Sequence, residues 1–428
     1  MESTLETLND HLASALTILR GGLNEELHTR LHNQEKGVLP DKELAELSFK
    51  TIDLLHSIEQ LLEPGQLALA DHFFGKHGKI NMLFGDTNLV FLSGYMNTKC
   101  LCAAVELQIP DILREHSPLS VEDLASKSGA RSDRLEQILN VLQNNGIFTY
   151  RDGKYSNNHT SMLLLRDHWT QWHNWIALYG NQFYDMSRGI PGSIRKEARR
   201  NPAQIEYDTD KDMFTYFREH GWVGQLHRTL GGGATAQSPG IVADYQWEEI
   251  SGETIIDVGG GGGALIALLL RAYPTMRGGI YDLPHVIDHT VPFFHTNDGQ
   301  FSDLSDRVPK ENLIGGDFFD HIPPSRVYTM KWTLHDWRDA DAIAILRNIR
   351  KAIISAPISR LIVLESVRAE GRSARLSRYA DLNMMVAANG LERNADSWKY
   401  LAEQSGWRIE AIHHLRNAWP CAIDMRPC

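Results

Sequence analysis

A histidine and an aspartate follow a strand-like run in the stretch KWTLHDW, residues 331–337. The residues VYTMKWTL are typical of a strand, and the residues DADAIAILRNIRKAI that come next are typical of a helix. Imidazole titrates near neutral pH, at about 6.5, so a histidine here could accept a proton from a substrate. The pattern therefore predicts a general base, His335, at the carboxyl end of a strand.

An acid in contact with the other ring nitrogen would fix the tautomer of such a base and stabilise its imidazolium form. Glu365 ends a second strand-like run, RLIVLE, and Gly259 follows a third. Sites in a doubly wound sheet lie at the carboxyl ends of strands, which groups these two residues with His335. Asp336 is a rival acid closer in sequence, and His335 taken alone could equally be a structural histidine.

A second candidate site is the glycine-rich loop in TIIDVGGGGGA, residues 254–264. A buried-strand run leads into the glycines and a helix-like run leaves them, so the backbone can turn tightly and offer free N–H groups to a ligand. Asp282 ends the next strand-like run, where a carboxylate can bind both hydroxyls of a ribose. The pattern predicts a nucleoside-binding unit, with a purely structural turn as the alternative.

The loop by itself leaves the identity of the nucleoside open. Gly259, Gly261 and Ala264 satisfy the dinucleotide form G-x-G-x-x-A, and Asp282 lies near the spacing expected of its acid, about 20 residues on. Asp257 is poorly placed for a pyrophosphate, because like charges repel, and suits a cationic ligand such as S-adenosylmethionine (SAM). NAD is further disfavoured because the sequence shows no second constellation for hydride transfer.

The elements that position these residues form an α/β protein with a helical N-terminal part. Strands alternate with helices after residue 254, which predicts a parallel, doubly wound, Rossmann-like sheet. Helices at 121–128 and 132–143, followed by two short strands around Asp152, predict a winged helix-turn-helix. We expect four regions: a helical extension (1–89), a winged-helix dimerisation domain (90–165), a helical substrate-pocket region (166–250) and the SAM-binding catalytic domain (251–428).

Charge and composition exclude several classes of function. The chain has 43 basic and 54 acidic residues, a net charge of -11, which disfavours nucleic acid and anionic membranes as partners. The winged-helix segment is also slightly acidic, so it favours dimerisation over DNA binding. The sequence shows no long apolar span, no secretory signal and no CxxC pair among its four cysteines, so we expect a cytoplasmic protein without a structural metal.

Aromatic residues crowd the region 166–250 and could line a cleft for a flat, apolar substrate. The alternative is that they belong to the core, as aromatic stripes more often do. His159 is expected either to face the pocket or to cap the following helix. The candidates for substrate contact are His159, Trp175, Phe183 and Met384.

Five motifs occur in order along the chain: DVGGGGG (257–263), YDLPHVI (281–287), GGDFFD (315–320), KWTLHDW (331–337) and NGLER (389–393). Together they resemble one enzyme family, the SAM-dependent O-methyltransferases of the plant caffeic-acid type, and especially their fungal relatives. The resemblance runs from about residue 90 to the end. It implies a SAM-binding domain and a homodimer whose N-terminal domains interlock.

The resemblance also implies a role for each matching residue. His335 would be the general base, held by Glu365 and Glu392. There are two departures: Gly262 stands where the family usually has threonine, and Gly231–Gly233 is expected to interrupt a stretch that is helical in the family. The residues implied to bind SAM are Asp257, Gly259 and Gly261 at the methionine and ribose, Asp282 and Leu283 at the ribose, Asp317 and Phe318 at the adenine, and Lys331 near both the base and the ribose.

The sequence therefore predicts methyl transfer from SAM to a hydroxyl of a small aromatic or polyketide-type metabolite. A phenol titrates near 10, so removal of its proton by His335 would assist the displacement. The alternative within the same family is a SAM-binding pericyclase, which accelerates dehydration, Alder-ene or hetero-Diels–Alder steps of a fungal polyketide or pyridone pathway. A SAM sensor without enzymatic activity is a third possibility, disfavoured by the acidic winged-helix segment.

Overall fold

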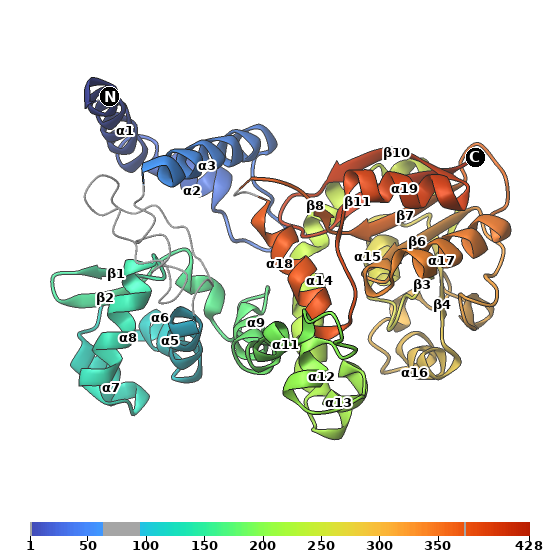
Figure 1. Ribbon diagram of the computed structural model, residues 1–428, viewed down its shortest axis with the longest axis horizontal. Helices are drawn as coiled ribbons and strands as arrows, with labels where there is room; N and C mark the ends of the chain where they lie inside the picture. Colours follow the sequence, from blue (N-terminus) through green and yellow to red (C-terminus); the bar gives the residue numbers. More distant parts are fainter. Residues whose placement is uncertain (1, 63–94, 372–373) are drawn as a thin grey trace. The chain divides into compact units, whose positions relative to one another are not determined.

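The computed structural model describes residues 2–62, 95–371 and 374–428 (Figure 1). The chain divides into two compact units, and the helix α14 (Val223–Ala243) contributes to both. The first unit contains Met1–Asp185 and Arg218–Ala236, and the second contains Met186–Phe217 and Gln237–Cys428.

A seven-stranded sheet forms the centre of the second unit, in the order β10-β11-β7-β6-β3-β4-β5. The strands from β7 to β5 in this order are parallel, as predicted. The prediction is wrong for β10 and β11, which are antiparallel to each other because the short loop 415–420 leaves no room for a crossover helix. The strands are β3 (Thr254–Val258), β4 (Arg277–Asp282), β5 (Leu313–Gly315), β6 (Val327–Lys331), β7 (Arg360–Glu365), β10 (Trp407–His414) and β11 (Cys421–Pro427).

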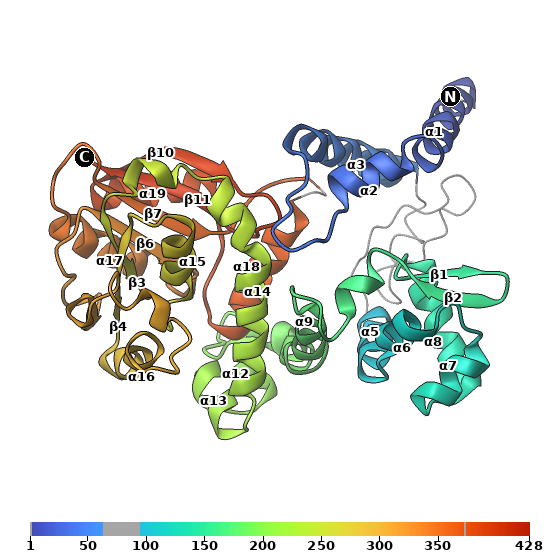
Figure 2. The same ribbon diagram turned by 180° about the vertical axis from the view of Figure 1, so that it is seen from behind.

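Helices cover both faces of this sheet. The helices α17 (Asp339–Ala352) and α19 (Ala395–Ser405) lie on the face seen in Figure 1. On the opposite face lies α15 (Ala264–Ala272), in front of the sheet in Figure 2. Successive residues of β3 enter opposite cores: Ile255 packs with α15, whereas Ile256 packs with α17 and α19. Both faces of the strand are thus apolar, which explains its continuous apolar run.

Shorter elements complete the second unit. Two short parallel strands, β8 (Val367–Arg368) and β9 (Arg393–Asn394), pair outside the main sheet. The remaining helices are α11 (Ile190–Ser193), α12 (Pro202–Glu206), α13 (Met213–Glu219), which reaches the unit boundary, α16 (Pro284–His295) and α18 (Arg375–Ala387).

The predicted helices and hairpin of the first unit are confirmed. Helix α7 is capped by Ser120, whose hydroxyl accepts a hydrogen bond from the Asp123 N–H, and it ends at Gly129 in the left-handed conformation. The predicted helical extension, residues 1–89, forms three helices as far as residue 62, and the rest of it lies outside the described residues. The elements are α1 (Glu2–Arg20), α2 (Asn24–Leu31), α3 (Lys42–Leu62), α5 (Tyr95–Glu106), α6 (Ile109–His116), α7 (Val121–Ser128), α8 (Ser132–Asn144), the hairpin β1 (Phe148–Arg151) and β2 (Lys154–Asn157), α9 (Trp172–Leu178), a π-helix (Tyr179–Phe183) and the start of α10 (Tyr184–Met186).

The expected interruption at Gly231–Gly233 is wrong, because α14 continues through all three glycines. A Cβ atom at Gly232 would lie 2.7 Å from Cβ of Gln171, and one at Gly233 would lie 2.4 Å from Cζ2 of Trp175. The missing side chains allow α14 to pack closely on α9. This contact offsets the low helix propensity of glycine, about 1 kcal/mol per residue relative to alanine.

Among the described residues, no helix combines the length and the apolar character that a transmembrane span requires.

Candidate active site

His335 lies in a short 3-10 turn, Leu334–Asp336, and not at the tip of a strand. Strand β6 ends three residues earlier than predicted, because the chain turns at Trp332, whose φ is 51°. The N–H groups of Thr333 and Leu334 then donate to Oε1 of Glu365, at 2.8 and 2.9 Å. The carboxylate on β7 therefore holds the turn that carries the histidine.

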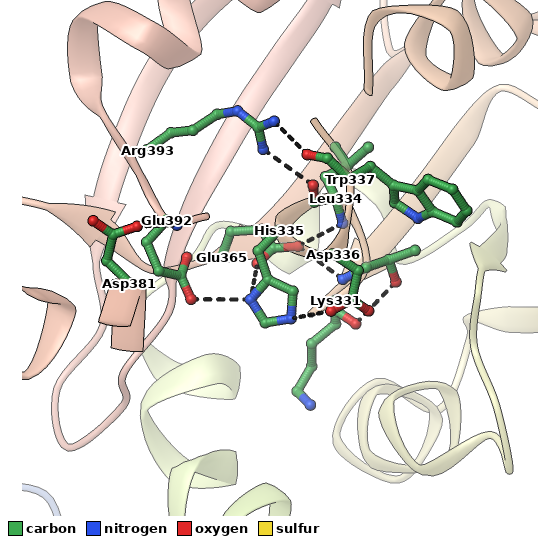
Figure 3. Close-up of polar contacts among 10 residues, drawn as sticks. Lys331, Leu334, His335, Asp336, Trp337, Glu365, Asp381, Glu392 and Arg393 are labelled. Atoms are coloured by element: carbon green, nitrogen blue, oxygen red, sulfur yellow. Dashed lines mark hydrogen bonds and ion pairs between the residues drawn. The ribbon is translucent and has the colours of Figure 1, made fainter. Parts of the chain in front are cut away.

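Two glutamates approach the same nitrogen of His335 (Figure 3). Its Nδ1 lies 2.9 Å from Oε1 of Glu392 and 3.3 Å from Oε2 of Glu365, and both acids are buried. Asp336 approaches the other side, with Oδ1 3.8 Å from Nε2. The structure thus brings together the three residues predicted to be catalytic, and it places the rival Asp336 at the opposite ring nitrogen.

The electrostatics of this cluster stabilise the imidazolium form. Burial disfavours the charged ring, but the carboxylates of Glu365 and Glu392 outweigh burial and raise the pKa of His335 to about 9. The ordinary value near 6.5 expected from the sequence is therefore too low. Burial raises the pKa of Asp336 to about 6, partly offset by the histidine, and burial also raises the pKa of Glu365.

The glycine loop packs against the histidine turn. Three of its glycines have left-handed backbones, with φ of 72° at Gly259, 53° at Gly261 and 82° at Gly263. A Cβ atom at Gly259 would lie 2.9 Å from Oγ1 of Thr333. Only a residue without a side chain lets the loop after β3 approach the turn after β6 this closely, so the two predicted sites are adjacent.

Asp282 lies at the end of β4, beside this loop, as the nucleoside-binding pattern requires. Its Oδ2 accepts a hydrogen bond from the Gly261 N–H at 2.9 Å, and its Oδ1 accepts one from the Leu283 N–H at 2.7 Å. The carboxylate is partly exposed and Leu283 is exposed. The acid therefore supports the loop and remains open to solvent at the sheet edge.

Asp257 is buried near the carboxyl end of β3. The hydroxyl of Thr329, its register partner on β6, donates to Oδ1 at 2.7 Å. Burial raises the pKa of Asp257 to about 7, against the opposing effects of that hydrogen bond and of Lys331. Near neutral pH the group is thus only partly ionised. Thr329 was not among the predicted site residues, although a lone hydroxyl in the apolar strand VYTMK was the available signal.

Three other residues with predicted cofactor roles also lie in the second unit. The Lys331 ammonium points away from the imidazole (Figure 3) and lies 3.9 Å from the centre of the Trp332 ring. Burial lowers the pKa of Lys331 to about 8. Asp317 accepts the N–H of Phe319 at 2.8 Å, and Phe318 meets the Phe319 ring at a centroid distance of 5.2 Å.

Three of the four residues predicted to contact substrate lie in the first unit. Trp175 and Phe183 are buried and stack on either side of Tyr179, at centroid distances of 5.2 and 4.5 Å. They belong to a column of stacked aromatic rings in the core, which was the alternative to lining a substrate cleft. Met384, the fourth, lies in α18 of the second unit and is partly buried.

His159 stacks on His32 with a centroid distance of 5.0 Å. The N-cap of the following 3-10 turn is Thr160, without a side-chain cap, and Oδ1 of Asn158 accepts the N–H groups of Thr160 and Ser161. The expected capping role of His159 is therefore wrong. The structure instead places the His159 ring against the segment that follows α2.

Two family models match the chain. The O-methyltransferase domain matches residues 230–408, and the O-methyltransferase dimerisation domain matches residues 89–167. The first match includes the glycine loop, the His335 turn and both glutamates.

Fungal relatives match along the whole chain. The O-methyltransferase aclM of Aspergillus oryzae is 52% identical over 431 residues, which cover 100% of this chain and 95% of that protein. The O-methyltransferase verK of Clonostachys rogersoniana is 45% identical over 430 residues, with 100% of both chains covered.

Solved structures share the fold. The mitomycin 7-O-methyltransferase MmcR has a TM-score of 0.62 and 26% identity, with 78% of this chain and 94% of that chain covered. CalO1, a methyltransferase in calicheamicin biosynthesis solved with S-adenosylhomocysteine, has a TM-score of 0.67 and 23% identity, with 78% and 95% covered. With the site geometry and the close fungal relatives, these matches show that the chain belongs to the O-methyltransferase family.

Proposed function

We propose that the protein transfers a methyl group from SAM to a hydroxyl group of a small aromatic secondary metabolite, with His335 as the general base. The observation that carries this proposal is the contact between the glycine loop and the turn that bears a glutamate-paired histidine. A cofactor site and a proton acceptor are thereby adjacent at one edge of the sheet. The fungal relatives named as O-methyltransferases support the same reaction.

The residues around the glycine loop fit SAM. The left-handed glycines leave the backbone accessible, and nothing lies within 4 Å of a Cβ built at Gly261. The partly exposed carboxylate of Asp282 suits ribose hydroxyls, and the carboxyl of Asp257 tolerates a neighbouring cation. When bound, SAM supplies a methyl group already activated by its sulfonium. The proposed contacts are Asp257, Gly259, Gly261, Asp282, Leu283, Asp317, Phe318 and Lys331.

Nε2 of His335 accepts the hydroxyl proton in this mechanism, because Nδ1 faces the two glutamates. The pKa of His335, about 9, is close to that of a phenol, which titrates near 10. The free-energy change of proton transfer from the phenol to the ring is therefore small. The raised pKa has a cost, since at pH 7 roughly one free-enzyme molecule in a hundred carries a neutral ring. Glu392 and Glu365 hold the ring orientation and stabilise the charge that forms.

The substrate class is proposed from the family. A solved family structure, NcsB1, carries 1,4-dihydroxy-2-naphthoic acid, a small aromatic molecule with hydroxyl groups. Of the four predicted substrate contacts, we propose Met384, which lies on α18 in the same unit as His335. The match to the dimerisation domain indicates a homodimer, and we propose that its N-terminal domains interlock and that the enzyme acts in the cytoplasm.

The experiment that tests this function incubates the purified protein with SAM and a panel of hydroxylated aromatic compounds. We expect S-adenosylhomocysteine together with a product heavier by one CH2, and loss of most turnover in His335→Asn with SAM affinity retained. His116→Asn, at an exposed histidine of the first unit, is the matched control. A product of unchanged or water-depleted mass, formed without consumption of SAM, would replace methyl transfer by a pericyclic reaction.

A further inference from the structure

We infer that Arg393 is a positioning residue, which clamps the turn that carries His335 and so sets the contact between the imidazole and its glutamates. This inference rests on the proposed role of His335 as the base. Arg393 follows Glu392 in the motif NGLER, and the predicted chemistry assigned it no role.

The guanidinium of Arg393 binds the turn on both sides of His335 (Figure 3). Its Nη1 donates to the carbonyl oxygen of Leu334 at 3.0 Å, and its Nη2 donates to that of Trp337 at 2.7 Å. Nε donates to Oδ1 of Asp339, at the start of α17, at 2.9 Å. The planar fork of an arginine can hold three acceptors in fixed directions, which a lysine cannot do.

The burial of this charge calls for an explanation. The Arg393 side chain is fully buried, whereas Asp339, its only ionic partner among the residues that the structure describes, is about half exposed. Burying a charge is costly, and an apolar residue of similar volume often fills such a space at least as well. The specific feature of the guanidinium is its hold on two carbonyls of the catalytic turn. The geometry therefore favours a role in fixing that turn over a role in filling space.

The three residues before Arg393 in the sequence also approach His335. The Leu391 N–H donates to the carbonyl oxygen of His335 at 2.8 Å, and Glu392 contacts its ring. A Cβ atom at Gly390 would lie 2.1 Å from that same carbonyl oxygen, so this close approach requires glycine. Residues 390–393 thus hold the ring, the backbone and the flanking carbonyls of the base.

Glu392 is itself anchored. Its N–H donates to Oδ1 of Asp381 at 2.9 Å, and Asp381 also pairs with Arg368 at 2.6 Å. The parallel pairing of β8 with β9 fixes the backbone of Arg393 opposite Val367. Loss of the Arg393 clamp would therefore free the histidine turn while the glutamate stays in place, and the distance between Nδ1 and the carboxylate would increase.

The test replaces Arg393 by alanine and by lysine. In Arg393→Ala we expect kcat to fall roughly 10- to 100-fold, the scale of an ångström-size misplacement, while the Kd for SAM from calorimetry stays within about twofold. We also expect the pKa of His335, measured by NMR in the free protein with labelled histidine, to fall below the wild-type value. Guanidinium ions added to the alanine variant should restore part of kcat and part of the His335 pKa. In Arg393→Lys both quantities should lie between those of the alanine variant and the wild type.

The matched control is Arg360→Ala, which removes another buried arginine of the same unit, paired with Asp424 and Glu249. It should lower Tm and leave the His335 titration unchanged. A lower Tm in Arg393→Ala with normal kcat and normal His335 titration would overturn the inference. If the alanine variant does not fold, an unaltered His335 titration in Arg393→Lys overturns it equally. If the wild type transfers no methyl group, the proposed function fails, whereas the NMR titration still decides the clamp.

Discussion

Nδ1 of His335 lies 2.9 Å from Oε1 of Glu392, while the second carboxylate, from Glu365, lies 3.3 Å from the same atom. One N–H therefore faces two acids. Only the Glu392 contact has hydrogen-bond geometry, and Oε1 of Glu365 instead accepts the N–H groups of Thr333 and Leu334. The two glutamates thus differ in role: one orients the ring, and the other holds the turn and adds charge.

This difference predicts unequal effects of charge removal. Glu365→Gln keeps a carbonyl oxygen for the two backbone N–H groups, so the turn should persist while the pKa of His335 falls. Glu392→Met, of similar size, removes the charge and also the oxygen that accepts the Nδ1–H, so it should lower that pKa and free the ring. It should cost more in kcat, about tenfold beyond Glu365→Gln, or about 1.4 kcal/mol. NMR titration and steady-state kinetics on both variants measure this. Equal losses in kcat would contradict the assignment.

The raised pKa of His335 also predicts the pH dependence of activity. The base works only when deprotonated, so kcat/KM should rise with pH up to about 9, where the free enzyme loses the imidazolium proton. In Glu365→Gln the rise should occur at lower pH. A rate profile of the wild type between pH 6 and 10 measures it. A plateau already reached at neutral pH would show that the carboxylates do not raise the pKa of the base.

A second pH effect concerns stability of the N-terminal region. Burial lowers the pKa of His159, and the neighbouring His32 lowers it further. A histidine whose folded pKa is lowered stabilises the fold above its unfolded pKa of about 6.5, and this contribution is lost as pH falls towards the folded value. We expect the segment after α2 to loosen below about pH 6.5. The reporter is fluorescence of Trp169, whose Nε1 donates to the Gln34 carbonyl at 2.9 Å. His159→Gln should weaken the pH dependence, and the part that remains should come from His32, whose pKa burial also lowers.

The close contact of α14 with α9 predicts opposite effects at neighbouring glycines. Gly233→Ala would force a methyl group towards Trp175 and should destabilise the protein by about 1–3 kcal/mol. Gly231→Ala is the matched control, because nothing lies within 4 Å of its Cβ, and it should stabilise by up to about 1 kcal/mol through helix propensity. Urea unfolding compares them. Similar effects of both substitutions would contradict the packing described.

The acid cluster makes a further prediction about metals. Ligand atoms of His335, Glu365 and Glu392 lie within 4.8 Å of one another, which is close enough for one ion. The proposed mechanism uses these groups for the proton, so dialysis against EDTA should leave turnover unchanged. Added Zn2+ should inhibit, since it would compete for the imidazole and the carboxylates. Loss of activity on chelation, restored by metal, would require a different mechanism.

The local pattern of the sequence predicted several helices, most strands of the parallel part of the sheet, and the edge that carries the site. The helix at 121–128, the strand that leads into the glycines and the acid at Asp282 all follow from periodicity, capping and glycine placement. His335 and Glu365 could be grouped because both follow parallel strands, and parallel strands end at one edge. These inferences succeed because each depends on residues close together in the chain.

The tertiary structure decided which groups meet at the histidine. Asp336 is adjacent in sequence but lies at Nε2, whereas Glu392, 57 residues away, reaches Nδ1. The end of β6 at Trp332 and the clamp by Arg393 likewise depend on partners from distant segments. Local periodicity carries no information on such contacts. The raised pKa of the base arises only when packing encloses its charge and two carboxylates in one buried site.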